Sequence, residues 1–184
     1  MAKLSVFIFM SLDGYYKGLN EDISWHKQNA ADEEFAASNL AANNVLIFGR
    51  RTYEMMASFW PTPMAIQQMP KVAEGMNRAD KVVFSRTLNM VDWEGTTLIK
   101  DDLNSSIRRL KAESDRDLTI LGSGELTTQL AAAGLIDRFD FMIDPLAIGN
   151  GTSVFKGLND ILELRLLSSK ALDNGALSLT YQPA

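Results

Sequence analysis

The stretch LTILGSGEL, residues 118–126, turns a strand into a helix, and the architecture predicted for the chain follows from that turn. Its first four residues favour a strand, and a Gly-Ser-Gly break follows them. A helix is predicted after the break because Leu126, Leu130 and Ala133 fall on one face of a 3.6-residue period. Gly134 then predicts the end of this helix.

A strand that turns through glycines into a helix presents free backbone N–H groups at the positive end of the helix dipole. Two glycines also let an anion approach the backbone closely. The turn formed by Gly122, Ser123 and Gly124 is therefore a candidate phosphate site. The alternative is a tight strand-to-helix turn without a ligand, since a short G-x-G motif is weak evidence by itself.

Two other predicted strands, residues 45–48 and 81–84, end in residues that suit an anion: Gly49, Arg50, Arg51 and Thr52 after the first, and Ser85 and Arg86 after the second. In open α/β sheets, ligands bind beyond the carboxyl ends of the strands. If the three ends are neighbours, the glycine turn would hold a pyrophosphate and the arginines a further phosphate. That combination describes NADPH better than NADH, and the alternative is that the arginines are surface charges.

The remaining pattern predicts an α/β domain with a largely parallel sheet and a C-terminal antiparallel hairpin. Further strands are predicted at residues 4–10, 97–99, 138–144, 161–167 and 176–181, and further helices at 32–43, at 53–58 and after Asp101 or Asp102. The hairpin is predicted from Asp173, Asn174 and Gly175. A loop is predicted around Pro61, Pro63 and Pro70, and an ordered loop over a site at residues 15–27.

Composition narrows the function classes. A chain of 184 residues fits one domain, residues 1–184, and a formal net charge of -5 argues against wholesale nucleic-acid binding. The absence of cysteine excludes a disulfide framework and a cysteine nucleophile, and it suits a reducing cytoplasm. The single histidine, His26, argues against zinc catalysis and against a Ser-His-Asp triad, so no metal is expected. No segment is apolar for long enough to predict a membrane span.

The strand-end motifs resemble those of dihydrofolate reductase. GRRTYE at residues 49–54 is similar to the G-R-x-T-x-E segment of that enzyme, Ser85 and Arg86 to its next cofactor-binding strand end, and residues 121–125 to its diphosphate turn. Two further features look closer to a sister group, the reductase domain of riboflavin biosynthesis and its small stand-alone relatives. These are SLDG at residues 11–14 and the segment from Pro145 to Phe155.

The resemblance runs from about residue 3 to residue 182. It implies a dihydrofolate reductase-like three-layer fold, in which helices flank a mixed, mostly parallel sheet of eight strands and NADPH lies across the strand ends. It also implies a set of cofactor contacts, with Met10 near the nicotinamide: Met10, Gly49, Arg50, Arg51, Thr52, Ser85, Arg86, Gly122, Ser123, Gly124, Glu125 and Leu126. The loop from Ser11 to about Ser24 would correspond to the mobile loop that closes over the cofactor.

The expected activity is NADPH-dependent hydride transfer to a small heterocycle, pterin- or pyrimidine-like, as in dihydrofolate reductase or 5-amino-6-(5-phosphoribosylamino)uracil reductase. Substrate contacts are expected from Asp13, Trp25, Phe35 and Trp60, although both tryptophans could equally be core or interface residues. The proton would come from Asp32 or from water.

Two alternatives remain open. One is a binding module of the same fold without turnover, and the other is a structural homo-oligomer with an interface at Phe59, Trp60 and the proline-rich loop. A homodimer is compatible with every reading. The expected partner is a small-molecule substrate, and neither a nucleic acid nor a membrane is expected.

Overall fold

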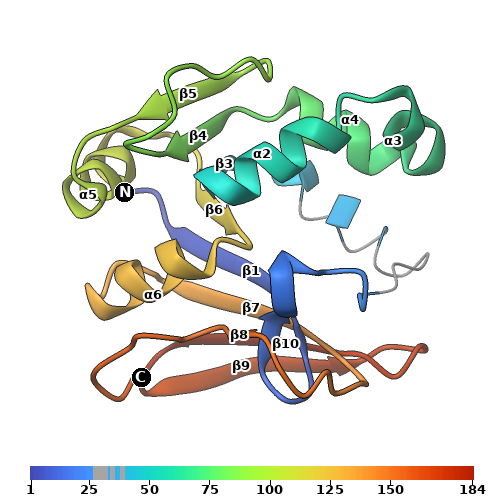
Figure 1. Ribbon diagram of the computed structural model, residues 1–184. Coiled ribbons are helices and arrows are strands. Elements are labelled where there is room, and N and C mark those ends of the chain that lie inside the picture. Colours follow the sequence, from blue (N-terminus) through green and yellow to red (C-terminus); the bar gives the residue numbers. More distant parts are fainter. Residues whose placement is uncertain (27–32, 34–35, 38–39) are drawn as a thin grey trace. The chain divides into compact units, whose positions relative to one another are not determined.

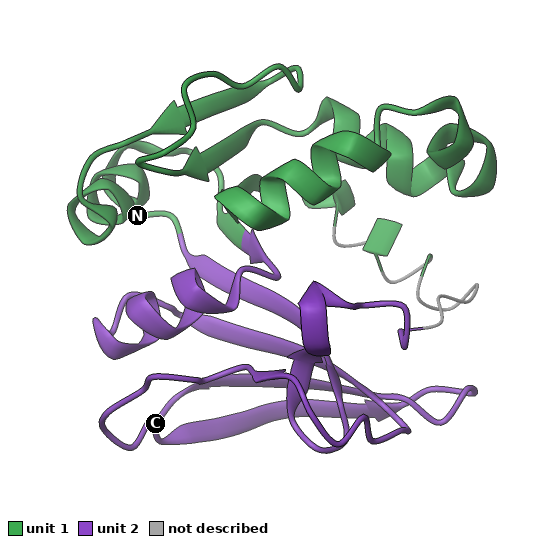
Figure 2. Cartoon of the chain, in the orientation of Figure 1, with its two compact units in different colours: residues 1–2, 28–119 green, residues 3–27, 120–184 purple. Residues whose placement is uncertain are grey.

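The computed structural model describes residues 1–26, 33, 36–37 and 40–184, and the chain forms two compact units (Figure 2). Unit 1 comprises residues 1–2 and 28–119, and unit 2 comprises residues 3–27 and 120–184. None of the helices among the described residues has the length and apolar character needed to cross a bilayer.

Figure 1 labels the described helices and strands except β2 and η1. The strands are β1 (Leu4–Ser11), β2 (Tyr15–Lys17), β3 (Val45–Gly49), β4 (Lys81–Phe84), β5 (Thr96–Ile99), β6 (Leu118–Leu121), β7 (Arg138–Asp144), β8 (Thr152–Ser153), β9 (Leu164–Ala171) and β10 (Leu177–Pro183). The helices are the short 3-10 helix η1 (Leu19–Glu21), α2 (Arg50–Phe59), α3 (Pro63–Gln68), α4 (Pro70–Arg78), α5 (Leu103–Glu113) and α6 (Gly124–Ala132).

Eight strands are hydrogen-bonded in the order β5-β4-β3-β6-β1-β7-β10-β9, and β2 pairs with β8 in a separate two-stranded sheet. The pairs β3–β4, β4–β5 and β1–β7 are parallel, whereas β10 is antiparallel to both β7 and β9. These pairings confirm the α/β class, the mixed eight-stranded sheet and the C-terminal hairpin. The expectation of a single domain over residues 1–184 stays a prediction.

In unit 1, β3 and β4 are buried almost throughout, as expected for central strands of a parallel sheet. Helix α4 buries Val72, Ala73 and Met76 on one face. Its C-terminal end is held by Lys81, a lysine that is only 1% exposed at the start of β4. Unit 1 thus places a charged group inside its apolar core.

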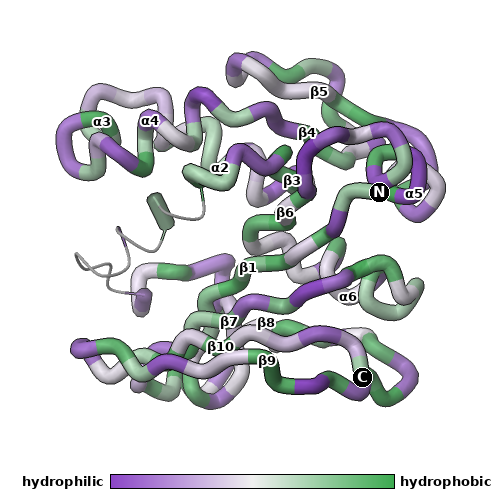
Figure 3. Tube along the Cα trace, turned by 180° about the vertical axis from the view of Figure 1, so that it is seen from behind, coloured by the Kyte–Doolittle hydropathy of each residue, from purple (hydrophilic) through white to green (hydrophobic). Residues whose placement is uncertain are grey.

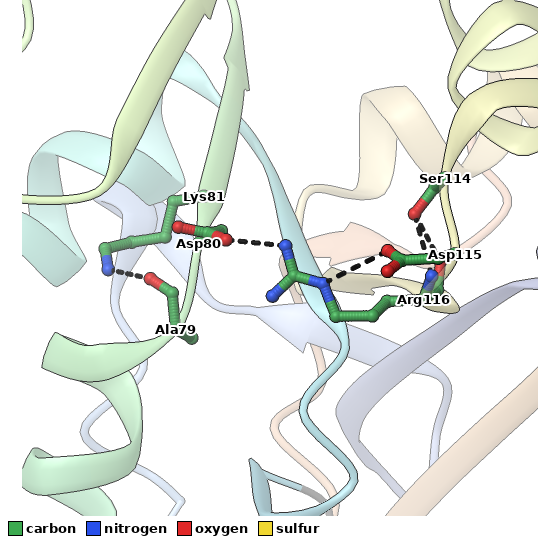
Figure 4. Close-up of polar contacts among 6 residues, drawn as sticks. All are labelled: Ala79, Asp80, Lys81, Ser114, Asp115 and Arg116. Carbon is green, nitrogen blue, oxygen red and sulfur yellow. Dashed lines mark hydrogen bonds and ion pairs between the residues drawn. The ribbon is translucent and has the colours of Figure 1, made fainter.

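The buried Lys81 ammonium is fully occupied by carbonyl groups. Its Nζ donates to the carbonyl oxygens of Met76 (3.0 Å), Asn77 (3.3 Å) and Ala79, and it lies 4.6 Å from the centroid of the Trp93 ring. Figure 4 shows the reach to Ala79 and the neighbouring ion pair of Asp80 with Arg116. The carbonyls at the end of a helix have no intrahelical partner, so Lys81 satisfies groups that burial would otherwise penalise.

In unit 2, β1 and β7 pair in parallel from Ser5 opposite Arg138 to Ser11 opposite Asp144. Figure 3 shows hydrophobic residues along most of β1, which is buried over its first five residues. Helix α6 runs alongside these strands (Figure 1) and buries Leu126 and Leu130. Gly134, at a φ of +64°, follows the helix as predicted.

The prediction of a loop around Pro61, Pro63 and Pro70 is wrong, because α3 and α4 occupy this segment. Pro63 and Pro70 each stand at the first position of a helix, where the missing N–H has no intrahelical partner to lose. Proline there starts a helix instead of preventing one.

Three other predictions need adjustment. Helix α2 begins at Arg50 instead of Tyr53, because Gly49 is extended (φ -82°, ψ 164°) and serves as the residue before the first turn. The strand predicted at residues 161–167 runs from Leu164 to Ala171, and the segment predicted as a loop contains β2 and η1. Within the helix predicted at residues 32–43, the described residues 33, 36–37 and 40–41 are helical, and residues 32, 34–35 and 38–39 lie outside the described residues.

Candidate functional site

Two predicted cofactor segments leave neighbouring strands of unit 1. Gly49, the last residue of β3, pairs with Phe84, the last residue of β4. Helix α2 starts directly at Arg50, which is about half exposed and lies 4.0 Å from Glu54 across one helical turn. Ser85 and Arg86 continue from Phe84, so the segments that carry Arg50 and Arg86 leave adjacent strand ends of unit 1.

The Ser85 hydroxyl shapes the turn that carries Arg86. Its oxygen accepts hydrogen bonds from the amides of Thr87 (3.2 Å) and Leu88 (3.0 Å). Asp102, which caps α5 by accepting from the Ser105 amide at 2.9 Å, lies close by. The pKa of Asp102 is lowered first by that amide, and the nearby Arg86 adds to the effect. Arg86 itself is exposed, and the Asp102 carboxylate is the nearby charge that an anion would compete with.

The glycine turn of unit 2 has the backbone that a phosphate site needs. Gly122 and Ser123 are both left-handed, with φ values of +59° and +52°, and the Gly122 amide donates to the Phe7 carbonyl at 3.0 Å. The first amide bonded back from the helix is that of Thr127, to Ser123, so the earlier amides of α6 precede any intrahelical bond. A left-handed serine costs roughly 1 kcal/mol, and such strain concentrates at functional sites.

Tyr16, from β2, packs directly against this turn. A Cβ built on Gly124 would lie 2.6 Å from two carbons of the Tyr16 ring, so only glycine allows the approach. Burial raises the pKa of the Tyr16 phenol. Tyr16 belongs to the segment 11–24, for which the resemblance predicts a mobile loop, and its ring lies on Gly124, the first residue of α6.

Two predicted site residues follow β1. Met10, opposite Ile143 in the sheet, is half-buried near the carboxyl end of the strand. Asp13 is exposed, and its carboxylate accepts from the amides of Ile148 (3.2 Å) and Gly149 (2.8 Å). Its pKa is lowered by the Ser11 hydroxyl and by these amides. Asp13 therefore anchors the loop after β7, and its expected role in substrate binding stays a prediction.

The two tryptophans differ. Trp60 is buried in unit 1, where its Nε1 approaches the Met56 sulfur at 3.0 Å and its carbonyl accepts from Asn77. This packing favours the core reading for Trp60. Trp25, in unit 2, has a buried Nε1 with no hydrogen-bond partner in the described part of the chain. Asp32 and Phe35 lie outside the described residues.

One group that the sequence did not suggest stands at the carboxyl ends of β1 and β7. The Nδ1 of His26 lies 2.7 Å from Oδ2 of Asp144, and its ring centroid is 3.9 Å from that of Phe9. His26 and Asp144 are 118 positions apart, so no spacing rule connects them. The available signal was a carboxylate at the end of a predicted central strand, which the loop histidine could reach.

The described residues contain no group of three or more His, Asp or Glu side chains that could hold a metal ion.

Comparison with known proteins was informative for the whole chain. The family model described as the RibD C-terminal domain matches residues 2–178. The uncharacterized protein YyaP of Bacillus subtilis (strain 168) is 22% identical over 173 residues, which cover 94% of this chain and 90% of YyaP.

Solved structures share the fold. A Shewanella sp. PV-4 protein described as a riboflavin biosynthesis protein has a TM-score of 0.79 at 24% identity and covers 100% of this chain and 99% of its own. Dihydrofolate reductase from Enterococcus faecalis, solved with NADP(H), has a TM-score of 0.67 at 15% identity, with 98% and 96% covered. These likenesses confirm the dihydrofolate reductase-like fold.

Proposed function

The chain belongs to the RibD C-terminal domain family, and from this premise we propose that it is an NADPH-dependent reductase of a small pterin- or pyrimidine-like heterocycle. The observation that carries the proposal is the pair of left-handed residues, Gly122 and Ser123, at the start of α6. Consecutive backbone amides at a helix start form an anion-binding concavity.

The resemblance to dihydrofolate reductase implies two groups of cofactor contacts, and each group lies within one unit. In unit 2, the amides at the start of α6 would hold the diphosphate. In unit 1, Arg50, Arg51 and Arg86 would hold the additional phosphate that distinguishes NADPH from NADH, because guanidinium groups bind phosphate oxygens in pairs. Met10 would lie near the nicotinamide. The bound cofactor supplies the hydride, and the protein supplies binding and orientation.

The proposal is tested by titrating the protein with NADPH and with NADH while following nicotinamide fluorescence. Arg50→Ala and Arg86→Ala should each weaken NADPH binding about tenfold, the value of one charge-assisted contact, and leave NADH binding nearly unchanged. Arg78→Ala is the matched control, since Arg78 is also exposed and pairs with a glutamate one helical turn away.

Failure to bind either cofactor would overturn the reductase proposal. An equal loss in the Arg78→Ala control would show that general charge, and not a phosphate site, governs the affinity. NADPH binding without NADPH oxidation across a broad panel of heterocycles would favour the binding module over the enzyme.

A further inference from the structure

Three residues of unit 2, Trp25, His26 and Asp144, form a group that we call the His26 cluster. Asp144 is the last residue of β7 and pairs with Ser11, the last residue of the parallel strand β1. The cluster therefore stands at the carboxyl ends of two adjacent parallel strands. Open α/β sheets bind their ligands at such ends.

Asp144 fixes the state of the histidine ring. The side chains of His26 and Asp144 are 9% and 8% exposed, and Nδ1 lies 2.7 Å from Oδ2. A buried carboxylate needs a donor, so the proton of the neutral imidazole belongs on Nδ1. Among the described residues, Asp144 is the charged neighbour of the His26 ring. The other neighbours, Phe9 and Trp25, are uncharged aromatic side chains.

The other ring nitrogen is buried and has no hydrogen-bond partner among the described residues. Because the two nitrogens of an imidazole diverge, Nε2 is directed away from Asp144. The Trp25 indole nitrogen, whose ring centroid lies 6.1 Å from that of His26, is also buried without a partner there. Buried polar atoms are nearly always hydrogen-bonded, so two such nitrogens on adjacent residues indicate a ligand that both contact.

Phe9 keeps the imidazole in place. The rings of Phe9 and His26 are 3.9 Å apart between centroids and inclined by 33°. Held by this contact on its face and by Asp144 at one nitrogen, the ring cannot turn Nε2 out to solvent without losing both interactions. An acid held in this way is preorganised, which is what general acid catalysis requires.

We propose that His26 is the catalytic acid of the reaction and that Asp144 is its positioning residue, an inference that rests on the proposed reductase function. Hydride addition to the carbon of a C=N or C=O group leaves its nitrogen or oxygen in need of a proton. The protonated ring donates that proton from Nε2, and the neutral ring keeps the proton on Nδ1 facing Asp144. Once the product has left, water that takes its place restores the proton on Nε2. During the reaction Trp25 donates a hydrogen bond to the same substrate.

The first test uses the fact that His26 is the only histidine in the chain. Long-range ¹H–¹⁵N spectra of the imidazole then contain one set of ring signals. At a pH where the ring is neutral, the wild type should carry its proton on Nδ1, and Asp144→Asn should shift the population toward the Nε2–H form. A wild-type ring with its proton on Nε2 would overturn the assignment without any need for turnover.

The second test measures hydride transfer as a function of pH with NADPH and a substrate found in the heterocycle panel. His26→Gln should lower the rate about 100-fold and abolish the fall in rate toward alkaline pH that loss of the acid's proton causes, while the affinity for NADPH stays within about twofold. Asp144→Asn should lower the rate less. Asp140→Asn is the matched control on the same strand, since Asp140 pairs with Arg138 and Thr180 instead.

The outcomes separate the two proposals. Turnover that is unchanged in rate and pH profile in His26→Gln would overturn the role of His26 and leave the reductase standing. NADPH binding with no turnover of any heterocycle would overturn the reductase, and with it the catalytic acid. A loss of activity in Asp140→Asn as large as that in Asp144→Asn would reduce the effect to general damage of β7.

Discussion

Each unit buries a basic side chain beside a tryptophan, but the two groups differ in how many of their polar atoms are paired. In unit 1, the Lys81 ammonium donates to three carbonyls, and the Trp93 indole donates to Oδ1 of Asn77 at 2.9 Å. In the His26 cluster of unit 2, one nitrogen of His26 is paired, while its other nitrogen and the Trp25 indole have no partner among the described residues.

The number of paired polar atoms distinguishes a buried group that only stabilises the fold from one that can still bind a ligand. A buried polar group with all its partners stabilises the fold and has nothing left to offer a ligand. A buried group that lacks a partner costs stability, roughly 1–3 kcal/mol, unless a ligand or water supplies the missing bond. Substitutions in unit 1 should therefore act on stability, and those in the His26 cluster should act on function.

The largest effect on stability is expected from Lys81→Ala. It leaves the carbonyls of Met76, Asn77 and Ala79 without their donor and removes the contact with Trp93, which together should lower the free energy of unfolding by about 3 kcal/mol. Urea denaturation measures this loss. Lys71→Ala, at an exposed lysine of α4, is the control and should change stability by less than about 0.5 kcal/mol. A loss below about 1 kcal/mol for Lys81→Ala would contradict the comparison.

A smaller effect should distinguish the two tryptophans. Trp93→Phe removes the donor of Asn77 and should cost about 1–2 kcal/mol, whereas Trp25→Phe removes an indole N–H without a described partner and should cost less. The double variant with Asn77→Leu isolates the hydrogen bond in unit 1 from the loss of ring volume, since residues in contact show a coupling energy. Zero coupling between Trp93 and Asn77 would show that the bond contributes nothing.

A pH dependence of stability that originates in unit 1 is also expected. Burial lowers the pKa of Lys81 to about 8 from its ordinary value of 10.5. Below pH 8 both the folded and the unfolded chain carry the charge, whereas between pH 8 and 10 the unfolded chain binds more protons, so stability contributed by this group rises with pH. Denaturation of wild type and Lys81→Met across this range should show the rise only in the wild type, and parallel curves would refute it.

Local sequence patterns predicted most of the helices and strands. Periodicity and turn residues, each read over a short stretch of sequence, predict the strand β6 and the start of α6 near the Gly-Ser-Gly turn. They also predict the hairpin at Gly175. The error at Pro63 and Pro70 has a local cause as well. Proline disfavours the interior of a helix and favours its first position, and the sequence does not by itself say which of the two applies.

The candidate site could be predicted only in part, because some of its components are short sequence motifs and others are contacts between residues far apart in the chain. The glycine turn and the arginines that follow β3 and β4 are short contiguous motifs. The family resemblance assigns all of them to one predicted cofactor site. The contact of Tyr16 with Gly124 and the pairing of His26 with Asp144 join residues that are far apart in the chain. The pairing of His26 with Asp144 depends on the register of β1 against β7, which no local pattern specifies.

The pairing of β1 with β7 also has a consequence during protein synthesis. Leu4 donates its amide to the side chain of Asp137, 133 residues later, and every residue of β1 pairs with a partner at a similar distance. At about 5–20 residues per second, a ribosome needs on the order of ten seconds to make the intervening chain. Throughout that time the most apolar strand of unit 2 has no β7 to pair with, so the nascent chain exposes an aggregation-prone segment that a chaperone would recognise.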